Sequence, residues 1–272
     1  MSPGVGTAYV WEVRKLVAQK RTYIGVGSAA LLPIVFVVVM GIQSGGPYDA
    51  PLGHNLRKTG LALGLVVLTF ASRFGAQLVT ALVAGDVVSS EHANGTLKMI
   101  FTRSLRRSQI LAGKTLASFT YVLVLLLALC VAGWIGGGIA WGFHPLTNLS
   151  GHQVSVGGGL ALTLAGLAIF SIPLISIACF GIFLSVVTRN SSAAIVGTLV
   201  YELAQEAIGG LVHASWAKHY LLSDQFDAWQ SVFQSPTYWT AIVRAVWVST
   251  LWGAVPLALA FVRFGRQDVA GG

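Results

Sequence analysis

Long apolar stretches alternate with short polar ones along the whole chain. A helix rises about 1.5 Å per residue, so about 20 apolar residues cross the hydrocarbon core of a bilayer. Stretches of this length predict six transmembrane helices, at about 22–42, 60–84, 115–141, 156–187, 191–212 and 238–264. We therefore expect an all-α integral membrane protein with a single transmembrane domain over residues 1–272.

Four glycines lie in the second half of the third apolar stretch: Gly133, Gly136, Gly137 and Gly138. Small residues let two helix backbones approach closely within a membrane. The glycines therefore predict either a close helix contact or a local break in this helix.

Two segments outside the six stretches carry apolar residues on one side only. Residues 5–21 are basic and contain Trp11, which predicts a helix lying in the inner membrane interface; the alternative is a frayed tail. Residues 213–237 predict a short amphipathic helix that lies on or dips into the outer leaflet. Its apolar positions follow a helical repeat: Leu222, Phe226, Trp229 and Phe233.

The loop 85–114, between the second and third stretches, is the longest polar and charged segment of the chain. The acids Asp86 and Glu91 and a basic cluster at residues 103–107 predict ionic contacts with a partner protein, and Ile100 and Phe101 predict apolar ones. The alternative is that the basic residues contact only lipid head groups at the inner surface.

Composition supports a membrane location and gives an orientation. The chain is 55% hydrophobic and 10% charged, with a mean hydropathy of +0.75, whereas soluble domains carry about 25% charged residues. The net charge of +8 lies mostly at the ends of the apolar stretches, so we expect no nucleic-acid partner. Twelve Lys and Arg fall in segments on the side of the N-terminus and three on the other side, which predicts that both termini are cytoplasmic.

Candidate catalytic or metal-binding groups are few. Gly113, Lys114 and Thr115 are similar to the end of a phosphate-binding loop, but that motif needs a glycine where the chain has Ser108. The two cysteines, Cys130 and Cys179, lie in apolar stretches and predict buried thiols. We expect no enzyme activity, no metal and no cofactor in this chain. The competing hypothesis is a metal- or haem-handling membrane protein that uses His213 and His219 with His144 or His152.

Apart from Arg263 at the very end of the last span, four charged residues fall inside the predicted spans: Arg73, Glu202, Glu206 and Arg244. A charge at membrane depth is costly and needs a partner or a water-filled cavity. Glu206 and Arg244 lie at matching depth, roughly 9 Å from the outer ends of their spans at 1.5 Å per residue, and predict an ion pair. Such charges either fix helix packing or line a substrate path, and both readings stay open.

The loop carries the motif of a known family. A glutamate is followed by Gly-Thr-Leu, a charged residue, a short apolar helix, an arginine and an apolar-Gly-Lys ending. The matching residues are Glu91, Gly95, Thr96, Leu97, Lys98, Arg107, Ile110, Leu111, Gly113 and Lys114. With six spans and an amphipathic N-terminal helix, the chain resembles the permease subunit of a type-2 ATP-binding-cassette (ABC) exporter; the proline usual in the motif is replaced by Ser104.

The resemblance implies a division of labour between proteins. The loop would form a coupling helix that docks on a separate ABC ATPase, and two ATPases and two permeases, the second identical to this one, would make the complex. ATP and Mg²⁺ would bind to the ATPase only. The outer segment 213–237 would cap the exit. The implied docking residues are Asp86, Glu91, Gly95, Thr96, Leu97, Lys98, Ile100, Phe101, Arg103, Arg106 and Arg107.

We therefore expect a multi-pass efflux protein of a bacterial plasma (inner) membrane. Oily spans with few charges favour a hydrophobic or amphipathic small molecule, lipid or peptide as cargo. Sodium export and the maturation of a metalloenzyme are alternatives for the same layout. A secondary transporter, coupled to an ion gradient through Glu202, Glu206 and Arg73, is an alternative of another class.

Overall fold

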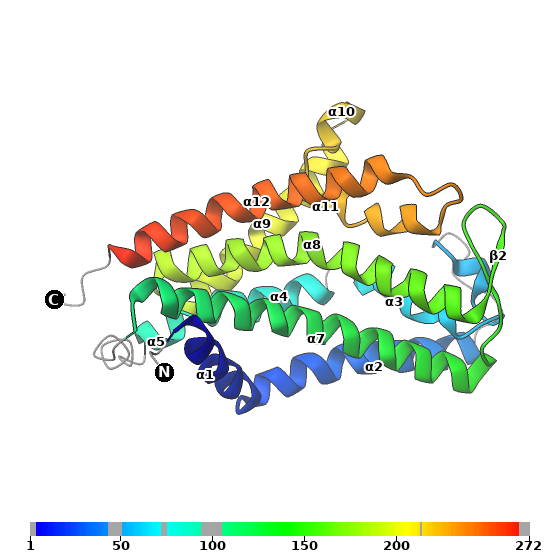
Figure 1. Cartoon of the computed structure of the whole chain (residues 1–272), viewed down its shortest axis with the longest axis horizontal. Coiled ribbons are helices and arrows are strands. Elements are labelled where there is room, and N and C mark those ends of the chain that lie inside the picture. The colour runs from blue at the N-terminus through cyan, green and yellow to red at the C-terminus, as the bar shows by residue number, and fades with distance from the viewer. Residues whose placement is uncertain (1–3, 43–50, 72–74, 94–104, 213, 267–272) are drawn as a thin grey trace.

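The computed structural model describes residues 4–42, 51–71, 75–93, 105–212 and 214–266, and this part of the chain is helical apart from short turns and one small hairpin (Figure 1). The helices follow the order of the apolar stretches. Their bounds are α1 Val5–Val17, α2 Lys20–Ile42, α3 Leu61–Ala71, α4 Gly75–Asp86, α5 Ser89–Ala93, α7 Arg107–Trp141, α8 Val156–Thr188, α9 Ser191–Leu211, α10 Ser215–Lys218, α11 Leu222–Gln225 and α12 Trp239–Gly265. The 3-10 helices are η1 Gly53–Asn55 and η2 Ala228–Phe233.

Four helices in the described part are long and apolar enough to cross a membrane: α2, α7, α8 and α12. Helices α3 and α4 meet at an angle of 67°, and they are a fifth candidate only if the bent pair counts as one span. The expected second span is therefore not one straight helix. Helix α9 has nearly the expected bounds, but its length and composition do not place it among the candidate spans. The protein is thus a membrane-embedded helical bundle, and the count of six spans stays a prediction.

The long polar loop is shorter than the sequence predicts. Helix α4 continues to Asp86, α5 follows, and α7 begins at Arg107 rather than at residue 115. No proline interrupts the chain between Ser108 and Thr115, and Gly113 is tolerated inside the helix because α1 packs directly over it. The ending of the motif in this loop is therefore the first two turns of α7.

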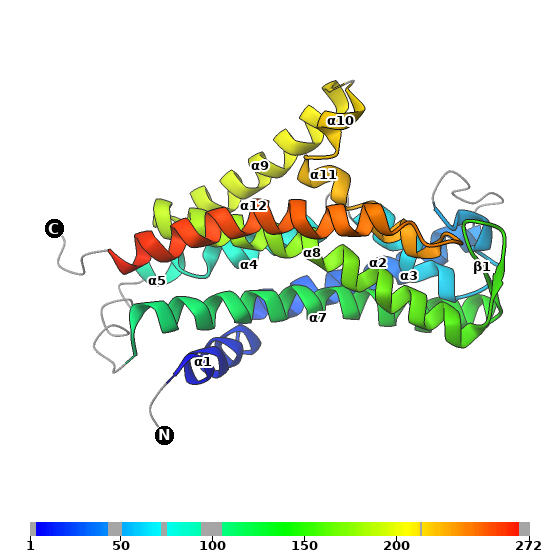
Figure 2. The same cartoon turned by 45° about the horizontal axis from the view of Figure 1, so that its top comes forward.

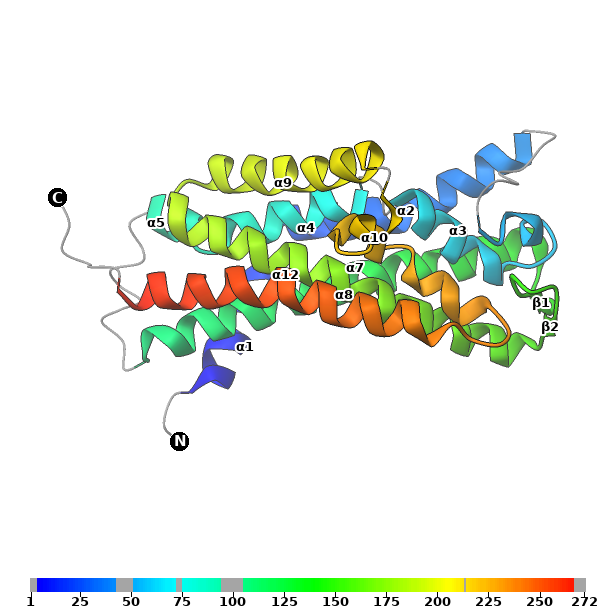
Figure 3. The ribbon, with the colours of Figure 1, turned by 90° about the horizontal axis from the view of Figure 1, so that it is seen from above.

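Helix α8 lies at the centre of the bundle, between α12, α4, α7 and α9 (Figures 2 and 3). Helix α3 is enclosed over its first two turns, because every residue from Leu61 to Leu68 is buried. An element that is apolar on all sides suits a fully buried position. In Figure 2, α9 diverges from the bundle toward the α10 end.

Two facing glycine pairs bring α3 and α7 together. A Cβ built on Gly137 would lie 2.7 Å from Cα of Gly60, and one built on Gly133 would lie 2.7 Å from Cα of Gly64. Side chains at these positions would separate the two backbones. Of the two expectations for the third stretch, close approach is therefore the one observed, since α7 runs unbroken to Trp141.

Two segments that connect the long helices, between α7 and α8 and between α9 and α12, differ from the prediction. The strands β1 Leu146–Thr147 and β2 Gln153–Val154 form an antiparallel hairpin in a segment expected to be a loop. The segment 213–237 contains α10, α11 and η2 rather than one amphipathic helix.

The four apolar side chains of the helical repeat in the segment 213–237 face the protein. Leu222, Phe226, Trp229 and Phe233 are all buried. The ring of Phe226 packs on Phe170 of α8 at 5.2 Å between centroids. These four side chains therefore contact protein rather than lipid, and the position of the segment 213–237 at the outer leaflet stays a prediction.

Candidate functional site: a basal ion-pair cluster

Charged side chains of opposite sign meet at the end of the bundle that holds α1, α5 and the end of α12 (Figure 1). We call this group the basal ion-pair cluster. Its members come from α1, the start of α2, the end of α4, α5 and α7, and are Glu12, Lys15, Arg21, Asp86, Glu91 and Lys114. Three carry a positive charge and three a negative charge, so the cluster is neutral as a whole.

Lys114 lies at the centre of the cluster and is fully buried, with 0% of its side chain exposed. Its Nζ donates to Oε1 of Glu12 at 2.8 Å, to Oε1 of Glu91 at 2.6 Å and to the carbonyl oxygen of Val87 at 3.2 Å. An ammonium group has three N–H donors, so all three are satisfied. A charge as deeply buried as this is tolerated only with such pairing.

Two further ion pairs extend the cluster toward the N-terminal helices. Nζ of Lys15 donates to Oε1 of Glu91 at 2.6 Å, and Arg21 pairs with Asp86. The carboxylates of Asp86 and Glu91 are 8% and 5% exposed. These two acids therefore bind basic groups of their own chain, which is a role that the sequence did not suggest. Both had been expected to contact a partner protein.

Helix α1 packs on the N-terminal end of α7 through small residues as well as through charged ones. A Cβ on Gly113 would lie 2.6 Å from Cβ of Ala8, so the two backbones nearly touch. The hydroxyl of Tyr9 lies 3.0 Å from Oγ1 of Thr120. Trp11, also on α1, is half exposed.

Hydroxyl groups hold the segment between α4 and α5 from the other side. Oγ of Ser185, on α8, accepts hydrogen bonds from the backbone N–H groups of Val88 at 3.1 Å and Ser89 at 2.9 Å. Oγ of Ser89 in turn lies 3.0 Å from Oγ of Ser191 on α9. Residues 86–93 are thus fixed by α1 and α7 on one side and by α8 and α9 on the other.

The Ser185 hydroxyl can be tested by its removal. Ser185→Ala leaves two buried N–H groups without their acceptor, and we expect a loss of about 1–3 kcal/mol in unfolding free energy. Ser171→Ala is the matched control, because the Ser171 hydroxyl donates only to a carbonyl of its own helix. Denaturant titration of both purified variants in detergent measures the difference. Equal stabilities would contradict the role of the Ser185 hydroxyl in holding residues 86–93.

The histidine of α5 adds no charge to this end of the bundle at neutral pH. Burial lowers the pKa of His92 below its ordinary value, and the positive charge of Arg189 lowers it further. His92 therefore adds no positive charge beside the basal ion-pair cluster at pH values above 7.

The remaining predicted docking residues divide into two groups. Arg106 is exposed just before α7, and Nη1 of Arg107 donates to the carbonyl oxygen of Gly265 at 3.1 Å, which joins α7 to the end of α12. The others lie outside the described residues: Gly95, Thr96, Leu97, Lys98, Ile100, Phe101 and Arg103.

The intramembrane charges do not form one group. Arg73 lies outside the described residues. Glu202 is buried, and no described residue hydrogen-bonds its Oε1, whereas Glu206 is exposed to a pocket. The ion pair that the structure gives to Arg244 is with Asp224, at 3.5 Å, in place of the predicted partner Glu206.

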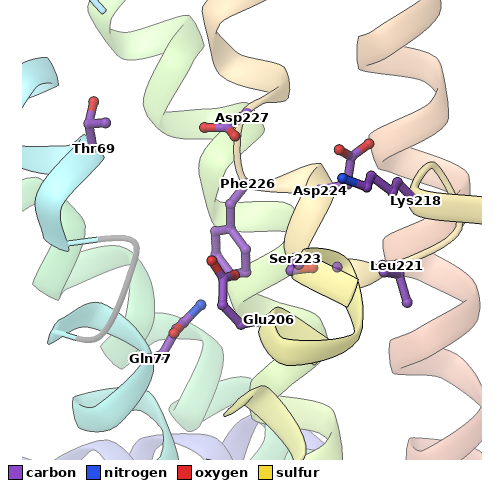
Figure 4. Close-up of a pocket in the computed structure, with 11 residues that line it drawn as sticks. Thr69, Gln77, Glu206, Lys218, Leu221, Ser223, Asp224, Phe226 and Asp227 are labelled. Atoms are coloured by element: carbon purple, nitrogen blue, oxygen red, sulfur yellow. The ribbon is translucent and has the colours of Figure 1, made fainter. Parts of the chain in front are cut away.

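The pocket beside Glu206 has a volume of about 270 Å³ and lies where α3 and α4 bend apart (Figure 4). Its polar lining comes from α3, α4, α9 and the α10–α11 region. In Figure 4, Gln77 and Glu206 point into the same space. The lining residues are Thr69, Gln77, Glu206, Gly209, Gly210, Lys218, Leu221, Ser223, Asp224, Phe226 and Asp227. Three carboxylates against one lysine give this space a negative character.

Metal ligation finds no support among the described residues. No group of three His, Cys, Asp or Glu side chains in this part of the chain is arranged to hold an ion. Cys130 and Cys179 are buried free thiols. His213, which belongs to the competing metal-site hypothesis, lies outside the described residues.

Sequence reasoning missed Glu12, Lys15 and Arg21 as members of a site. The sequence ended the polar loop at Lys114, so the burial of this lysine, which requires a paired acid, was not evident. The sequence does not say which acid, since Glu12 and Lys114 are 102 residues apart in the chain.

Comparisons with known proteins place the chain in a family. The chain is similar to "Uncharacterized protein YhcI" of Bacillus subtilis (strain 168), with 29% identity over 206 residues, or 71% of this chain. The match spans 64% of the length of that relative. A family model described as "Protein of unknown function (DUF2705)" matches residues 51–270, which contain every described helix after α2. The chain therefore belongs to the DUF2705 family.

Proposed function

We propose that this chain is the membrane-spanning permease subunit of an ATP-driven ABC exporter, with ATP hydrolysis on a separate ATPase. The observation that carries the proposal is the fixation of residues 86–93 by four other helices. A motor protein needs an attachment point that does not deform when it is pushed. Displacement of this segment would move α1, α4 and α7 together.

The proposal includes the parts that the resemblance implies. Six spans, with α9 as the fifth and the bent α3–α4 pair as the second, would place both termini in the cytoplasm of a bacterial cell, beside the ATPase. Helix α1 would lie in the inner membrane interface, with its exposed Trp11 toward lipid. Two copies of the chain and two ATPases would form the working complex.

Transport by this complex would follow a two-state switch. Closure of the ATPase pair on ATP would push the two loops together, and the basal ion-pair cluster would carry the movement into α7 and α4. A hydrophobic or amphipathic small molecule, lipid or peptide is the cargo that the oily spans favour. Sodium export and metalloenzyme maturation remain alternatives for the same architecture.

A secondary transporter is the second candidate, and one specific observation favours it. Broken helices and ionisable side chains at membrane depth mark substrate sites in such transporters. The bend of 67° between α3 and α4 lies beside the acidic pocket that contains Glu206. An ion gradient, and not ATP, would then drive transport.

Purification of the tagged chain from its native membrane, in a mild detergent, separates the two candidates. We expect an ATPase subunit to co-purify in equal amount, as measured by mass spectrometry and by Mg-ATP hydrolysis. Arg106→Glu reverses an exposed charge next to α7 and is expected to lower ATPase recovery several-fold. Lys58→Glu, an exposed position at the other end of the bundle, is the matched control.

Two results would contradict the proposal. One is a folded, monodisperse chain that carries no ATPase yet transports in vesicles under an ion gradient. The other is unchanged ATPase recovery with Arg106→Glu. Glu91→Lys is a poor variant for this purpose, because it would set a third ammonium group against Lys15 and Lys114 and disturb the chain itself.

A further inference from the structure

A second pocket lies on the outside of α12, near the start of that helix and away from the basal ion-pair cluster. It has a volume of about 520 Å³ and a lining that is mainly aromatic. The walls come from α10, the residues that follow it and the first turns of α12. They consist of Trp216, His219, Tyr220, Trp239, Thr240, Val243, Arg244 and Trp247. We call this space the α12 pocket.

The aromatic walls of the α12 pocket are held in place by the fold. The rings of Tyr220 and Trp247 meet edge to face, with centroids 5.7 Å apart. Nε1 of Trp252 donates to the carbonyl oxygen of Tyr220 at 2.8 Å, which fixes this connection against α12. Trp216 and Trp239 are 70% and 68% exposed. Exposed tryptophan and tyrosine rings are typical of the boundary between head groups and hydrocarbon in a membrane.

Arg244 supplies a cation with unfilled hydrogen-bonding capacity in the α12 pocket. Its side chain is 24% exposed, and its buried Nε finds no hydrogen-bond partner among the described residues. The contact of Nη2 with Oδ2 of Asp224 is 3.5 Å long, whereas a full charge-assisted bond measures about 2.7–2.9 Å. A guanidinium has five N–H donors, so most remain available to a ligand.

The acid near Arg244 does not itself line the α12 pocket. Asp224 lines the neighbouring acidic pocket and does not line the α12 pocket. Its Oδ2 is shared with Nδ1 of His219 at 3.2 Å. The α12 pocket therefore combines a partly paired cation with apolar aromatic walls, and no carboxylate lines it.

We propose that the α12 pocket binds the phosphate head group of an anionic membrane lipid. The guanidinium of Arg244 would donate to the phosphate oxygens in the fork geometry that arginine offers to such groups. Trp239 and Trp247 are eight residues apart on α12, or about 12 Å along the helix axis, and the first acyl carbons would lie along Val243 between them. The inference goes beyond the proposed exporter function and needs no ATPase partner.

Lipid retention by the purified full chain tests this inference. Native mass spectrometry would compare dioleoyl phosphatidylglycerol with dioleoyl phosphatidylcholine, which has the same chains and no net charge. We expect the wild type to retain the anionic lipid preferentially, and Arg244→Gln to weaken that retention about tenfold, as expected for one charge-assisted contact. Arg263→Gln removes an exposed charge from the other end of the same helix and should leave the preference unchanged.

Two further measurements complete the test. Sodium phosphate at millimolar concentration should not displace the lipid, because the acyl chains contribute to binding; displacement would point to a free-phosphate site and overturn the lipid assignment. Thermal unfolding shows whether Arg244→Gln is folded, and if it is not, the lipid preference of the wild type decides. Equal retention of both lipids by the wild type would overturn the proposal. An undiminished preference for the anionic lipid in a folded Arg244→Gln variant would also overturn it.

Discussion

Lys114→Met is expected to lower the unfolding free energy by about 3 kcal/mol, because it leaves buried carboxylates without their central cation. Methionine has nearly the length of lysine, so the change removes charge and donors with little change in packing volume. The expected loss lies at the lower end of values for broken buried ion pairs, since Lys15 keeps its contact with Glu91. The measurement is a denaturant titration of the purified protein in detergent.

The same variant should loosen α1 specifically. Two of the interactions that hold α1 to α7 are lost with Lys114, directly to Glu12 and indirectly through Glu91. Hydrogen exchange of the α1 amides should therefore become faster by more than the change in global stability explains. A role of Lys114 in overall packing alone would not produce this difference.

Two further variants distinguish the loss of the buried ion pairs from a general effect of removing a lysine. Lys20→Met removes an exposed lysine at the start of α2, and we expect a change within about 0.5 kcal/mol. Adding Glu91→Gln to Lys114→Met should recover part of the loss, because it removes the stranded charge, and an interaction energy of about 1–2 kcal/mol is expected for residues in contact. A Lys114→Met protein as stable as the Lys20→Met control would refute the energetic role assigned to the cluster.

The spans themselves were largely predictable, because apolar length is a property of each segment alone. Predicted limits of 22–42, 156–187 and 238–264 compare with Lys20–Ile42, Val156–Thr188 and Trp239–Gly265 in the structure. The bend between α3 and α4 was not predictable in this way. Both helices are apolar, and the division depends on how they pack against α7, α8 and α9.

Periodicity in residues 213–237 identified which side chains act together but not what they contact. Leu222, Phe226, Trp229 and Phe233 do share an environment, and it is the surface of α8 and not the outer leaflet. In a membrane protein, lipid and protein interior are equally apolar. A hydrophobic pattern therefore cannot distinguish the two surroundings.

For the charged residues of the candidate site, the sequence does not show which groups they pair with. The sequence identifies Glu91 and Lys114 as unusual, but a charge near a membrane surface pairs equally well with a partner protein, with lipid or with its own chain. Which of these partners is used depends on the packing of α1 against the N-terminal end of α7. This contact joins residues 102 positions apart in the chain. Glu91 and Lys114 belong to the family motif, and the structure adds that both are buried and paired with each other inside this chain.

Gly137→Ala and Gly136→Ala are expected to change stability in opposite directions, although the residues are neighbours on α7. A Cβ at position 137 would meet Cα and the carbonyl oxygen of Gly60 at 2.7 Å each, and backbone atoms cannot move aside. At position 136 the nearest atom is Cγ2 of Val37, at 3.6 Å, which is ordinary contact. The first change forces α3 and α7 apart, and the second does not.

The magnitudes follow from two competing effects. Alanine in place of glycine favours a helix by up to about 1 kcal/mol, so Gly136→Ala should leave stability unchanged or raise it by that amount. Overpacking costs about 1–3 kcal/mol, and the rigid backbone contact places Gly137→Ala near the upper end, for a net loss of about 2 kcal/mol. Thermal unfolding of both variants in the same detergent measures the difference. Equal changes of the same sign would show that the helices can separate freely, and would remove the close glycine contact as a source of stability.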